Sequence, residues 1–379
     1  MKRLPLLLFC LFVLPATAQQ PQLTRPPQDF SIAAKSYALI DLQSGQTLVG
    51  QNVHDRVEPA SLTKLMTAYV VFGALYQKRI SLTQAVPVSD QARRAPGSRM
   101  FIDPSKPVTV DELIRGVIVQ SGNDASIALS EAVAGSESAF TQLMNKEAGR
   151  LGMKNTRFVN STGLPDPDHY STAHDLGLLA AAIVRTFPEY YPLYSLREYT
   201  YNKITQTNRN RLLWLDPNVD GIKTGFTEGA GYCLISSAKR GERRLVSVVM
   251  GTISDSARTI ESQRLLNYGF QYYDTVRLYA KEREVTAIQL WKGTQDKLRT
   301  GFAQDVYFSL PRSQADKLKA KMEFKQPLIA PVSAGQKVGT VKFMLDGKLM
   351  GERPLVALEA VSSGNLLGRA VDSVRLLFN

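Results

Sequence analysis

Residues 59–75 read PASLTKLMTAYVVFGAL, and this stretch decides how the rest of the chain is interpreted. Its apolar residues recur at helical spacing, which predicts an amphipathic helix from Ser61 to Leu75. Residues three apart on a helix share a face, so Ser61 Oγ and Lys64 Nζ can meet without another element. A helix start also offers unpaired N–H groups and a positive dipole end. A lysine buried there can lose its proton and serve as general base for a serine nucleophile.

On its own this S-x-x-K motif is a weak signal, because an N-capping serine followed by a solvated lysine gives the same letters. Two further triplets are present: Ser121-Gly122-Asn123, which breaks a helical pattern, and Lys223-Thr224-Gly225, which lies in a predicted strand. The first offers a hydroxyl and an amide. The second offers a positive charge, a hydroxyl for a substrate carboxylate and room for a substrate against the strand. A turn or a surface strand would explain either triplet alone. The ordered set, spaced by 60 and then 102 positions, is typical of serine β-lactamases and penicillin-binding proteins.

The segments around these motifs predict an α+β domain over residues 28–275. Two apolar runs around Ser44-Gly45 predict a hairpin. Helices are predicted at 111–133 with a break near Gly122, at 138–151, at 175–184 and at 254–270. Strands are predicted at 198–201, 221–226, 232–237 and 245–250. This order implies a helical block and an antiparallel sheet in which the first hairpin pairs with the late strands.

The character of the sequence changes near Tyr273, which predicts a second, small all-β domain over residues 276–362. Short runs with period-two alternation lie at 285–291, 306–310, 341–345 and 355–360. Asp346-Gly347 is a tight-turn signal between two of them. No long helical pattern occurs in this part of the chain.

The last segment, residues 363–379, predicts an amphipathic helix. The apolar side chains that share one face are Leu366, Leu367, Ala370, Val371, Val374, Leu377 and Phe378. Arg369, Asp372, Ser373 and Arg375 fall on the opposite face. At 1.5 Å per residue this helix is roughly 20 Å long, too short to cross a bilayer, so we expect it to lie in the interface of an anionic membrane. The alternative is a terminal helix docked on the β domain.

Residues 1–18 resemble an export signal. Lys2 and Arg3 precede an apolar run over residues 4–14, and Ala16-Thr17-Ala18 supplies the small residues of a cleavage site. The alternative, a membrane anchor, is disfavoured because a spanning helix needs roughly 20 apolar residues. The formal net charge of +12 suits anionic lipid heads or an anionic wall polymer, and export argues against nucleic acid as a partner.

Metal and disulfide chemistry are not expected. The three histidines match no metal motif, and two cysteines cannot form a thiolate metal site. Cys10 would leave with the export signal, so Cys233 would remain alone and is most simply a small buried hydrophobe.

The chain resembles the low-molecular-mass penicillin-binding proteins of the D-alanyl-D-alanine carboxypeptidase family, of the Gram-negative membrane-associated type. The similarity runs from about residue 30 to the C-terminus. Besides the three motifs, the matching segments are Asn208-Arg209-Asn210, Trp214, residues 219–225, Gly229-Ala230-Gly231-Tyr232, Val249-Met250-Gly251, Glu261-Ser262 and Leu265-Leu266. The resemblance implies a transpeptidase-like catalytic domain, no cofactor, peptidoglycan stem pentapeptides as substrate and β-lactams as covalent inhibitors. It also implies a periplasmic protein bound to the outer face of the inner membrane.

The resemblance further implies roles in bond breaking. Ser61 would be acylated by the penultimate D-alanine of the peptide, with release of the terminal one. Lys64 would be the base for acylation and for deacylation by water. Ser121 would pass a proton toward the leaving amine, and Asn123 would hold the substrate amide and help to fix Lys64.

The remaining matching residues are implied in substrate binding. Lys223, Thr224 and Arg258 would receive the terminal carboxylate, Gly225 would let the substrate approach, and Arg209 matches a basic residue near that site. The backbone N–H groups of Ser61 and Phe226 would form the oxyanion hole. Relatives often carry histidine in place of Phe226, but a backbone N–H is independent of the side chain, so we expect the hole to survive.

Two rival functions fit the sequence less well. A β-lactamase of class A adds a glutamate that positions a water for deacylation, whereas residues 166–175 contain no glutamate and the extra β domain is foreign to that class. A catalytically silent wall-binding scaffold should have lost part of the motif set, and all three motifs are intact. The motifs leave open whether endopeptidase activity accompanies carboxypeptidase activity.

Overall fold

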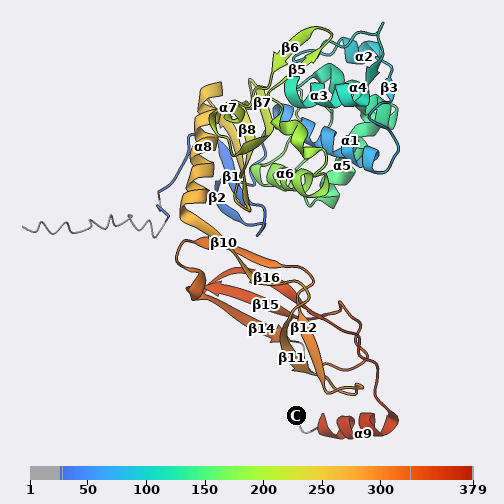
Figure 1. The fold of residues 1–379 in the computed structure, drawn as a ribbon, viewed down its shortest axis with the longest axis vertical. Helices are drawn as coiled ribbons and strands as arrows, with labels where there is room; N and C mark the ends of the chain where they lie inside the picture. Colours follow the sequence, from blue (N-terminus) through green and yellow to red (C-terminus); the bar gives the residue numbers. More distant parts are fainter. Residues whose placement is uncertain (1–25, 28, 325, 378–379) are drawn as a thin grey trace, which may run out of the picture.

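The computed structural model describes residues 26–377 except 28 and 325, so the predicted export signal and Phe378 lie outside the described residues. Figure 1 shows two domains stacked along the long axis, a larger mixed helix-and-sheet domain and a smaller β domain, with a terminal helix at the far end of the β domain. The α+β expectation for the larger domain and the all-β expectation for the smaller one are both confirmed.

The larger domain is built on a five-stranded antiparallel sheet with strand order β2-β1-β9-β8-β7. Its strands are β1 (Ser36–Asp41), β2 (Thr47–Gln51), β7 (Val219–Thr227), β8 (Gly231–Arg240) and β9 (Arg243–Thr252). The predicted first hairpin does pair with the late strands, since Tyr37 lies opposite Val249. Successive residues of a strand face opposite sides, so Ile235 packs under the helical block while Leu234 packs under the other face.

Helices cover both faces of this sheet (Figure 1). The helical block consists of α1 (Lys64–Tyr76), α2 (Asp90–Arg93), α3 (Val110–Arg115), α4 (Asn123–Ala134), α5 (Glu137–Arg150) and α6 (Ala173–Thr186). The opposite face is covered by α8 (Asp255–Tyr272). Smaller elements are the hairpins β3 (Ala85–Val86) with β4 (Val108–Thr109) and β5 (Glu198–Tyr201) with β6 (Ile204–Thr207), the short helix α7 (Leu212–Leu215) and the 3-10 turn η3 (Tyr191–Ser195).

The helix predicted from Ser61 differs from its expectation in two ways. Ala60–Thr63 form a 3-10 turn, η1, and the α-helix begins only at Lys64. The helix is also not amphipathic: nearly all of its side chains, Lys64 included, are buried, because it runs through the middle of the helical block. The sequence predicted the helix but not its central position, and that position buries Lys64.

The predicted break in the helix over residues 111–133 is confirmed. After α3 the chain makes one π-helical turn, η2 (Gly116–Gln120), and Ser121 then adopts a left-handed conformation with φ of 61°. The next helix, α4, starts at Asn123. The break therefore leaves Ser121 outside regular helix at the end of one segment.

The β domain contains a five-stranded antiparallel sheet with order β11-β12-β16-β15-β14 and a separate pair, β10 with β13. The strands are β10 (Tyr273–Tyr279), β11 (Glu284–Gln289), β12 (Lys297–Gly301), β13 (Val306–Pro311), β14 (Leu318–Phe324), β15 (Lys337–Leu345) and β16 (Lys348–Ala357), with a 3-10 turn, η4 (Ala315–Lys317), before β14. Asp346-Gly347 joins β15 to β16, as predicted. We did not predict β10, β12 or β14 from the sequence.

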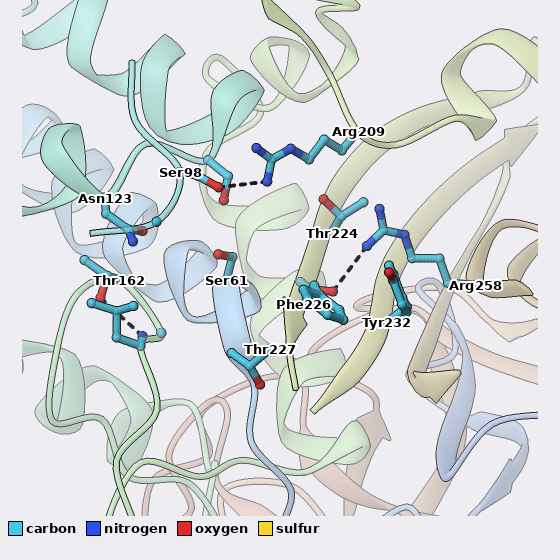
Figure 2. Close-up of a pocket in the computed structure, with 15 residues that line it drawn as sticks. Ser61, Ser98, Asn123, Thr162, Arg209, Thr224, Phe226, Thr227, Tyr232 and Arg258 are labelled. Atoms are coloured by element: carbon cyan, nitrogen blue, oxygen red, sulfur yellow. Dashed lines mark hydrogen bonds between the residues drawn. The ribbon is translucent and has the colours of Figure 1, made fainter. Parts of the chain in front are cut away.

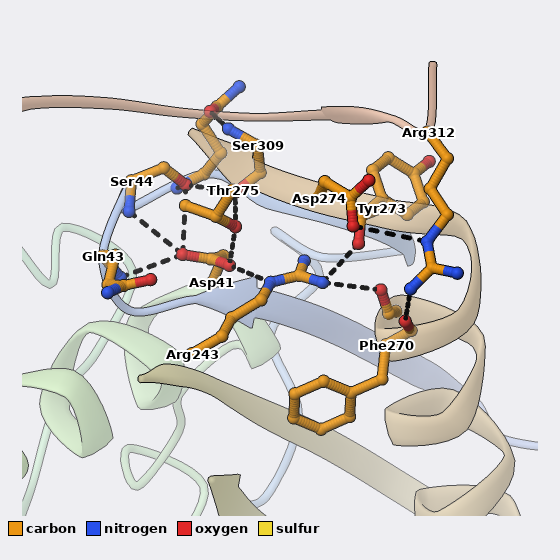
Figure 3. Close-up of polar contacts among 12 residues, drawn as sticks. Asp41, Gln43, Ser44, Arg243, Phe270, Tyr273, Asp274, Thr275, Ser309 and Arg312 are labelled. Carbon is orange, nitrogen blue, oxygen red and sulfur yellow. Dashed lines mark hydrogen bonds and ion pairs between the residues drawn. The ribbon is translucent and has the colours of Figure 1, made fainter. Parts of the chain in front are cut away.

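A polar cluster, which we call the domain joint, connects the two domains (Figure 3). Its centre is the fully buried Asp41 at the end of β1. This carboxylate accepts hydrogen bonds from Arg243 Nε at 2.8 Å and from Thr275 Oγ1 of β10 at 2.6 Å. Ser44 Oγ lies 2.8 Å from Ser309 Oγ of β13. Since α8 leads directly into β10, the joint braces a connection that has no linker.

The terminal helix α9 (Leu366–Arg375) lies at the end of the molecule farthest from the larger domain (Figure 1). Its N-cap is Asn365, whose Oδ1 accepts from Gly368 N at 2.8 Å. Asp372 Oδ2 accepts from Lys292 N of the β domain at 2.6 Å, so the polar face holds the helix. Within the part of the chain that is described, no helix has the length and apolar character needed to cross a membrane.

Candidate active site

The three motifs meet at a cavity of about 470 Å³ between the helical block and the β7 edge of the sheet. Eight of the ten predicted site residues line it: Ser61, Ser121, Asn123, Arg209, Thr224, Gly225, Phe226 and Arg258. The other two, Lys64 and Lys223, are buried next to it. Figure 2 shows Ser61 in the middle of this cleft, with Asn123 and Thr162 on one side and Thr224 with Phe226 on the other.

Lys64 is only 1% exposed and its Nζ has three oxygen neighbours. Ser61 Oγ lies at 3.1 Å, Asn123 Oδ1 at 2.6 Å and the Thr162 carbonyl oxygen at 2.5 Å. Burial, followed by the charge of Arg209, lowers the pKa of Lys64 to about 7. The amine is therefore neutral in a large fraction of molecules near neutral pH.

The hydrogen bonds of neutral Lys64 determine the direction of its nitrogen lone pair. A neutral amine has two hydrogens, and the Asn123 amide oxygen and the Thr162 carbonyl can only accept. When these two acceptors take both hydrogens, the lone pair faces the Ser61 hydroxyl, which can donate. The sequence did not indicate Thr162, because the group it contributes is a backbone carbonyl that any residue carries.

Ser121 contributes a buried hydroxyl without a hydrogen-bond partner in the described residues. Its backbone at the helix break holds it at the wall of the cavity. Asn123 is fixed beside it, since its backbone N donates to Ser98 O at 2.7 Å and its Nδ2 donates to Pro96 O at 2.6 Å. An unpartnered hydroxyl at this place is available to exchange a proton with a bound molecule.

Strand β7 forms the opposite wall and lies tightly against the η1 turn. A Cβ atom on Gly225 would come within 3.2 Å of the Pro59 carbonyl oxygen and 3.3 Å of Ala60 Cβ. Glycine therefore allows this close approach of strand and turn. The same closeness brings Phe226 to the rim opposite Ser61.

Cationic side chains converge on the cleft. Lys223 is buried, and burial together with the charges of Lys64 and Arg209 holds its pKa well below the ordinary value. Arg258 Nη1 donates to Gly225 O at 3.2 Å, and its guanidinium is paired with Asp255. Arg209 Nη1 donates to Ser98 Oγ at 2.8 Å. Burial lowers the pKa of both arginines. Such a cluster favours an anionic group, for example a carboxylate, in the cleft.

The side chain of Phe226 is half exposed and lies over Tyr232, with ring centroids 4.4 Å apart. The Arg258 guanidinium also lies near Tyr232, 5.5 Å from the ring centroid. Tyr232, Thr227 and Leu164 also line the cavity, and we had not predicted them as site residues. The described residues contain no cluster of three or more metal-ligating side chains arranged to hold an ion.

Comparison with known proteins assigns both domains to characterised families. Residues 18–254 match the family model described as D-alanyl-D-alanine carboxypeptidase, and residues 273–363 match that of the penicillin-binding protein 5 C-terminal domain. The chain is 43% identical over 357 residues to D-alanyl-D-alanine carboxypeptidase DacC of Escherichia coli (strain K12), covering 92% of this chain and 89% of that protein.

Solved structures agree. Penicillin-binding protein 5 from Haemophilus influenzae superposes with a TM-score of 0.85 at 40% identity, covering 88% of this chain and 99% of that one. Penicillin-binding protein D2 from Listeria monocytogenes, in its ampicillin-bound form, superposes with a TM-score of 0.60 at 30% identity, covering 65% of this chain and all of that one. The chain belongs to the D-alanyl-D-alanine carboxypeptidase family and is a serine hydrolase with a penicillin-binding protein fold.

Proposed function

We propose that the chain removes the terminal D-alanine from peptidoglycan stem pentapeptides through an acyl-enzyme on Ser61. The observation that carries this proposal is the buried Lys64 amine, 3.1 Å from Ser61 Oγ, with a pKa of about 7 and two acceptors that take its hydrogens. This arrangement gives a general base that needs neither histidine nor metal.

In the acylation step, Lys64 accepts the Ser61 proton while Oγ attacks the carbonyl carbon of the penultimate D-alanine. The N–H groups of Ser61 and Phe226 stabilise the negative charge on the carbonyl oxygen. Ser121 then relays this proton from Lys64 to the amine of the departing D-alanine as its C–N bond breaks, which leaves Lys64 neutral again. In deacylation, Lys64 accepts a proton from the attacking water and returns it to Ser61 Oγ, which leaves as the hydroxyl.

The cationic side of the cleft binds the end of the substrate. Lys223, Thr224 and Arg258 receive its carboxylate, and Arg209 adds positive charge. Buried positive charges repel one another strongly. A carboxylate bound between them is therefore stabilised more than it would be in water. Asn123 holds the substrate amide, and the substrate lies against β7 at Gly225.

We also propose that β-lactams acylate Ser61. The related Listeria protein is bound to ampicillin in its solved structure. A β-lactam presents a strained amide and a carboxylate, which correspond to the scissile bond and the terminal carboxylate of the peptide.

The test is mass spectrometry of purified protein incubated with a pentapeptide ending in D-Ala-D-Ala. We expect loss of one alanine and covalent addition of penicillin to a peptide that contains Ser61. The Ser61→Ala variant should show neither, while its fold is checked by thermal melting. Penicillin bound to another serine, or peptide turnover by Ser61→Ala, would refute the assignment.

For the terminal helix we propose contact with the anionic surface of the inner membrane on its periplasmic side. Leu366, Leu367 and Val374 are more than half exposed, although they are apolar. The polar face is occupied, since Asp372 accepts from Lys292 N. Contact with the β domain through the polar face leaves the apolar face for a lipid interface.

Flotation with vesicles tests this proposal. The full chain should float with phosphatidylglycerol vesicles, and a chain ending at Ser363 should stay in the heavy fraction while retaining full activity on a small peptide. Val374→Asp, which places a charge in the apolar face, should behave like the truncated chain. High salt should weaken binding only partly, because apolar burial remains when charges are screened. Equal flotation of full-length and truncated protein would overturn the proposal.

A further inference from the structure

His169 is a buried histidine behind the cleft that none of the steps above uses. It does not line the active-site cavity, but its ring bonds to two segments of the chain. Val159 N donates to its Nδ1 at 3.2 Å, and its Nε2 lies 2.7 Å from Thr63 Oγ1. Because Nδ1 accepts a hydrogen bond, the neutral ring carries its proton on Nε2, which donates to Thr63.

These two segments are the ones that hold Lys64. Thr63 directly precedes Lys64 in the chain. Val159 opens the loop 159–163, in which the Thr162 carbonyl accepts from Lys64 Nζ. The histidine thus joins the residue before the base to the loop that supplies one of its acceptors.

The loop 159–163 also packs closely on the η1 turn and on α1. Thr67 Oγ1 donates to Ser161 O at 2.7 Å. Gly163, with φ of +84°, passes so close that a Cβ there would lie 1.8 Å from the Ala60 carbonyl oxygen. These contacts restrict the loop, so the Thr162 carbonyl stays in a fixed position relative to Lys64.

We propose that His169 is a positioning residue for proton transfer: by joining Thr63 to Val159 it fixes the Thr162 carbonyl against Lys64, and so directs the Lys64 lone pair at Ser61. This inference rests on the proposed function of Lys64 as the base. It predicts that His169 affects the rate of the proton-transfer step more than the binding of substrate or inhibitor.

The environment of the ring suits this role, which requires one acceptor and one donor. A doubly protonated ring would carry two donors, and the bond from Val159 N would be lost. The charged groups that face the ring are Asp166 and Lys64, and burial dominates, lowering the pKa of His169 to about 4. The ring edge also packs on Phe158, with centroids 5.7 Å apart. His169 is therefore neutral near pH 7 and adds no positive charge beside Lys64.

The experiment measures acylation of the full chain by a fluorescent penicillin in stopped flow, which separates the dissociation constant of the first complex from the acylation rate constant. His169→Ala should lower the rate constant about tenfold or more, with the dissociation constant unchanged within threefold, because a small displacement of a catalytic group is enough for such a loss. His169→Gln, whose amide both donates and accepts, should stay within threefold of the parent.

Two further variants complete the design. Thr63→Val removes the hydroxyl at the other end of the bond and should reproduce the loss of His169→Ala, and the double variant should lose no more than either alone. His174→Ala is the matched control, since the ring of this partly exposed histidine lies beside the Asp175 carboxylate and the His54 ring, and contacts neither Thr63 nor Val159 in the described residues. Melting curves exclude variants that do not fold, and Thr63→Val keeps the test valid if His169→Ala is one of them.

The outcomes separate the two proposals. If the parent chain is not acylated at Ser61, the proposed function fails. If the parent is acylated and a folded His169→Ala or Thr63→Val variant retains a rate constant within threefold, the positioning role is refuted. Equal losses in His169→Gln and His169→Ala, or losses that add in the double variant, would also refute it.

Discussion

At the scale of single residues, the site depends on a lysine that is cationic in water and neutral where it works. The two nearest hydrogen-bond partners of its Nζ, Asn123 Oδ1 and the Thr162 carbonyl oxygen, are acceptors at 2.6 and 2.5 Å. Neither can donate, so the protonation state of Lys64 alone decides whether a lone pair is available to Ser61. The rate should therefore follow that protonation state directly.

The first prediction concerns pH. Burial lowers the pKa of Lys64 from 10.5 to about 7, so the neutral base is populated above about pH 7 and lost as the pH falls below it. The acylation rate by a penicillin should rise from pH 5 to a plateau near pH 8, with a midpoint near 7. Stopped-flow rates over this range check it, with melting curves at each pH as control. A midpoint near the ordinary lysine value would contradict the neutral-base mechanism.

The second prediction concerns Phe226, whose ring rests on Tyr232 while its backbone is the proposed oxyanion donor. Phe226→His should keep kcat/KM on a pentapeptide within about tenfold, or roughly 1.4 kcal/mol of transition-state stabilisation. Phe226→Ala is the companion variant that removes the ring altogether. A loss of about 10³ in Phe226→His would mean that the side chain shapes the cleft and that the backbone argument is wrong.

Single residues also show what a sequence can and cannot indicate. The predicted side chains meet at the cleft because each motif fixes residue type and spacing together. The Thr162 carbonyl and the His169 link have no such signature, since one is backbone and the other depends on a contact between residues 106 positions apart. Tertiary packing alone reveals them.

At the scale of elements, the start of α4 organises one wall of the cleft. Asp124, in its first turn, is buried and accepts from the backbone N of Met100, Phe101 and Ile102 at 3.0, 2.8 and 3.2 Å. A carboxylate at a helix N-terminus is also stabilised by the helix dipole. The helix therefore holds the preceding loop, and that loop supplies the Ser98 and Pro96 oxygens that fix Asn123.

The third prediction follows. Asp124→Ala leaves two buried N–H groups and one partly buried N–H group without their acceptor, and should lower the free energy of unfolding by about 3 kcal/mol or more. Acylation should slow as well, because the loop no longer fixes Asn123. Calorimetry and stopped flow measure the two effects. Asp111→Ala, which breaks a partly exposed i,i+4 pair with Arg115, is the control and should change stability by less than about 1 kcal/mol. Equal effects in the two variants would show that Asp124 has no special role.

Two elements also show how far the periodicity of the sequence predicts the structure. Residues 64–75 are buried almost all round, including polar Thr67, whose hydroxyl bonds to Ser161 O. Such a helix has no solvent face, so periodicity predicts its existence but not its surroundings. In the β domain, residues 318–324 of β14 read LKAKMEF, in which apolar and charged residues alternate strictly. The period-two signal of a strand is therefore present there, and our sequence analysis missed it; the pairing with β15 confirms the strand.

At the scale of the whole molecule, the domain joint is separated from the cleft by the width of the sheet. Asp41 ends β1, next to the β2 edge, whereas the cleft lies at the β7 edge. The chemistry of the cleft and the coupling of the domains should therefore respond to different substitutions.

The fourth prediction tests this separation. Asp41→Ala leaves Arg243, which is largely buried, without its carboxylate, and breaking a buried pair in this way typically costs about 3–5 kcal/mol. We expect a clearly lower melting temperature, with the rate of Ser61 acylation at 25 °C within threefold of the parent. Arg277→Ala, which removes an exposed pair with Asp305, is the control. An acylation rate that fell with stability would show that the joint does act on the cleft.

The joint also has a hydrodynamic consequence. Its hydrogen bonds come from β1, β9, β10 and β13 in different directions, so they resist twisting of the β domain as well as bending (Figure 3). Two domains on a loose linker diffuse rotationally with two separate correlation times. An elongated body braced in this way instead has one anisotropic diffusion tensor, shared by the amide groups of both domains.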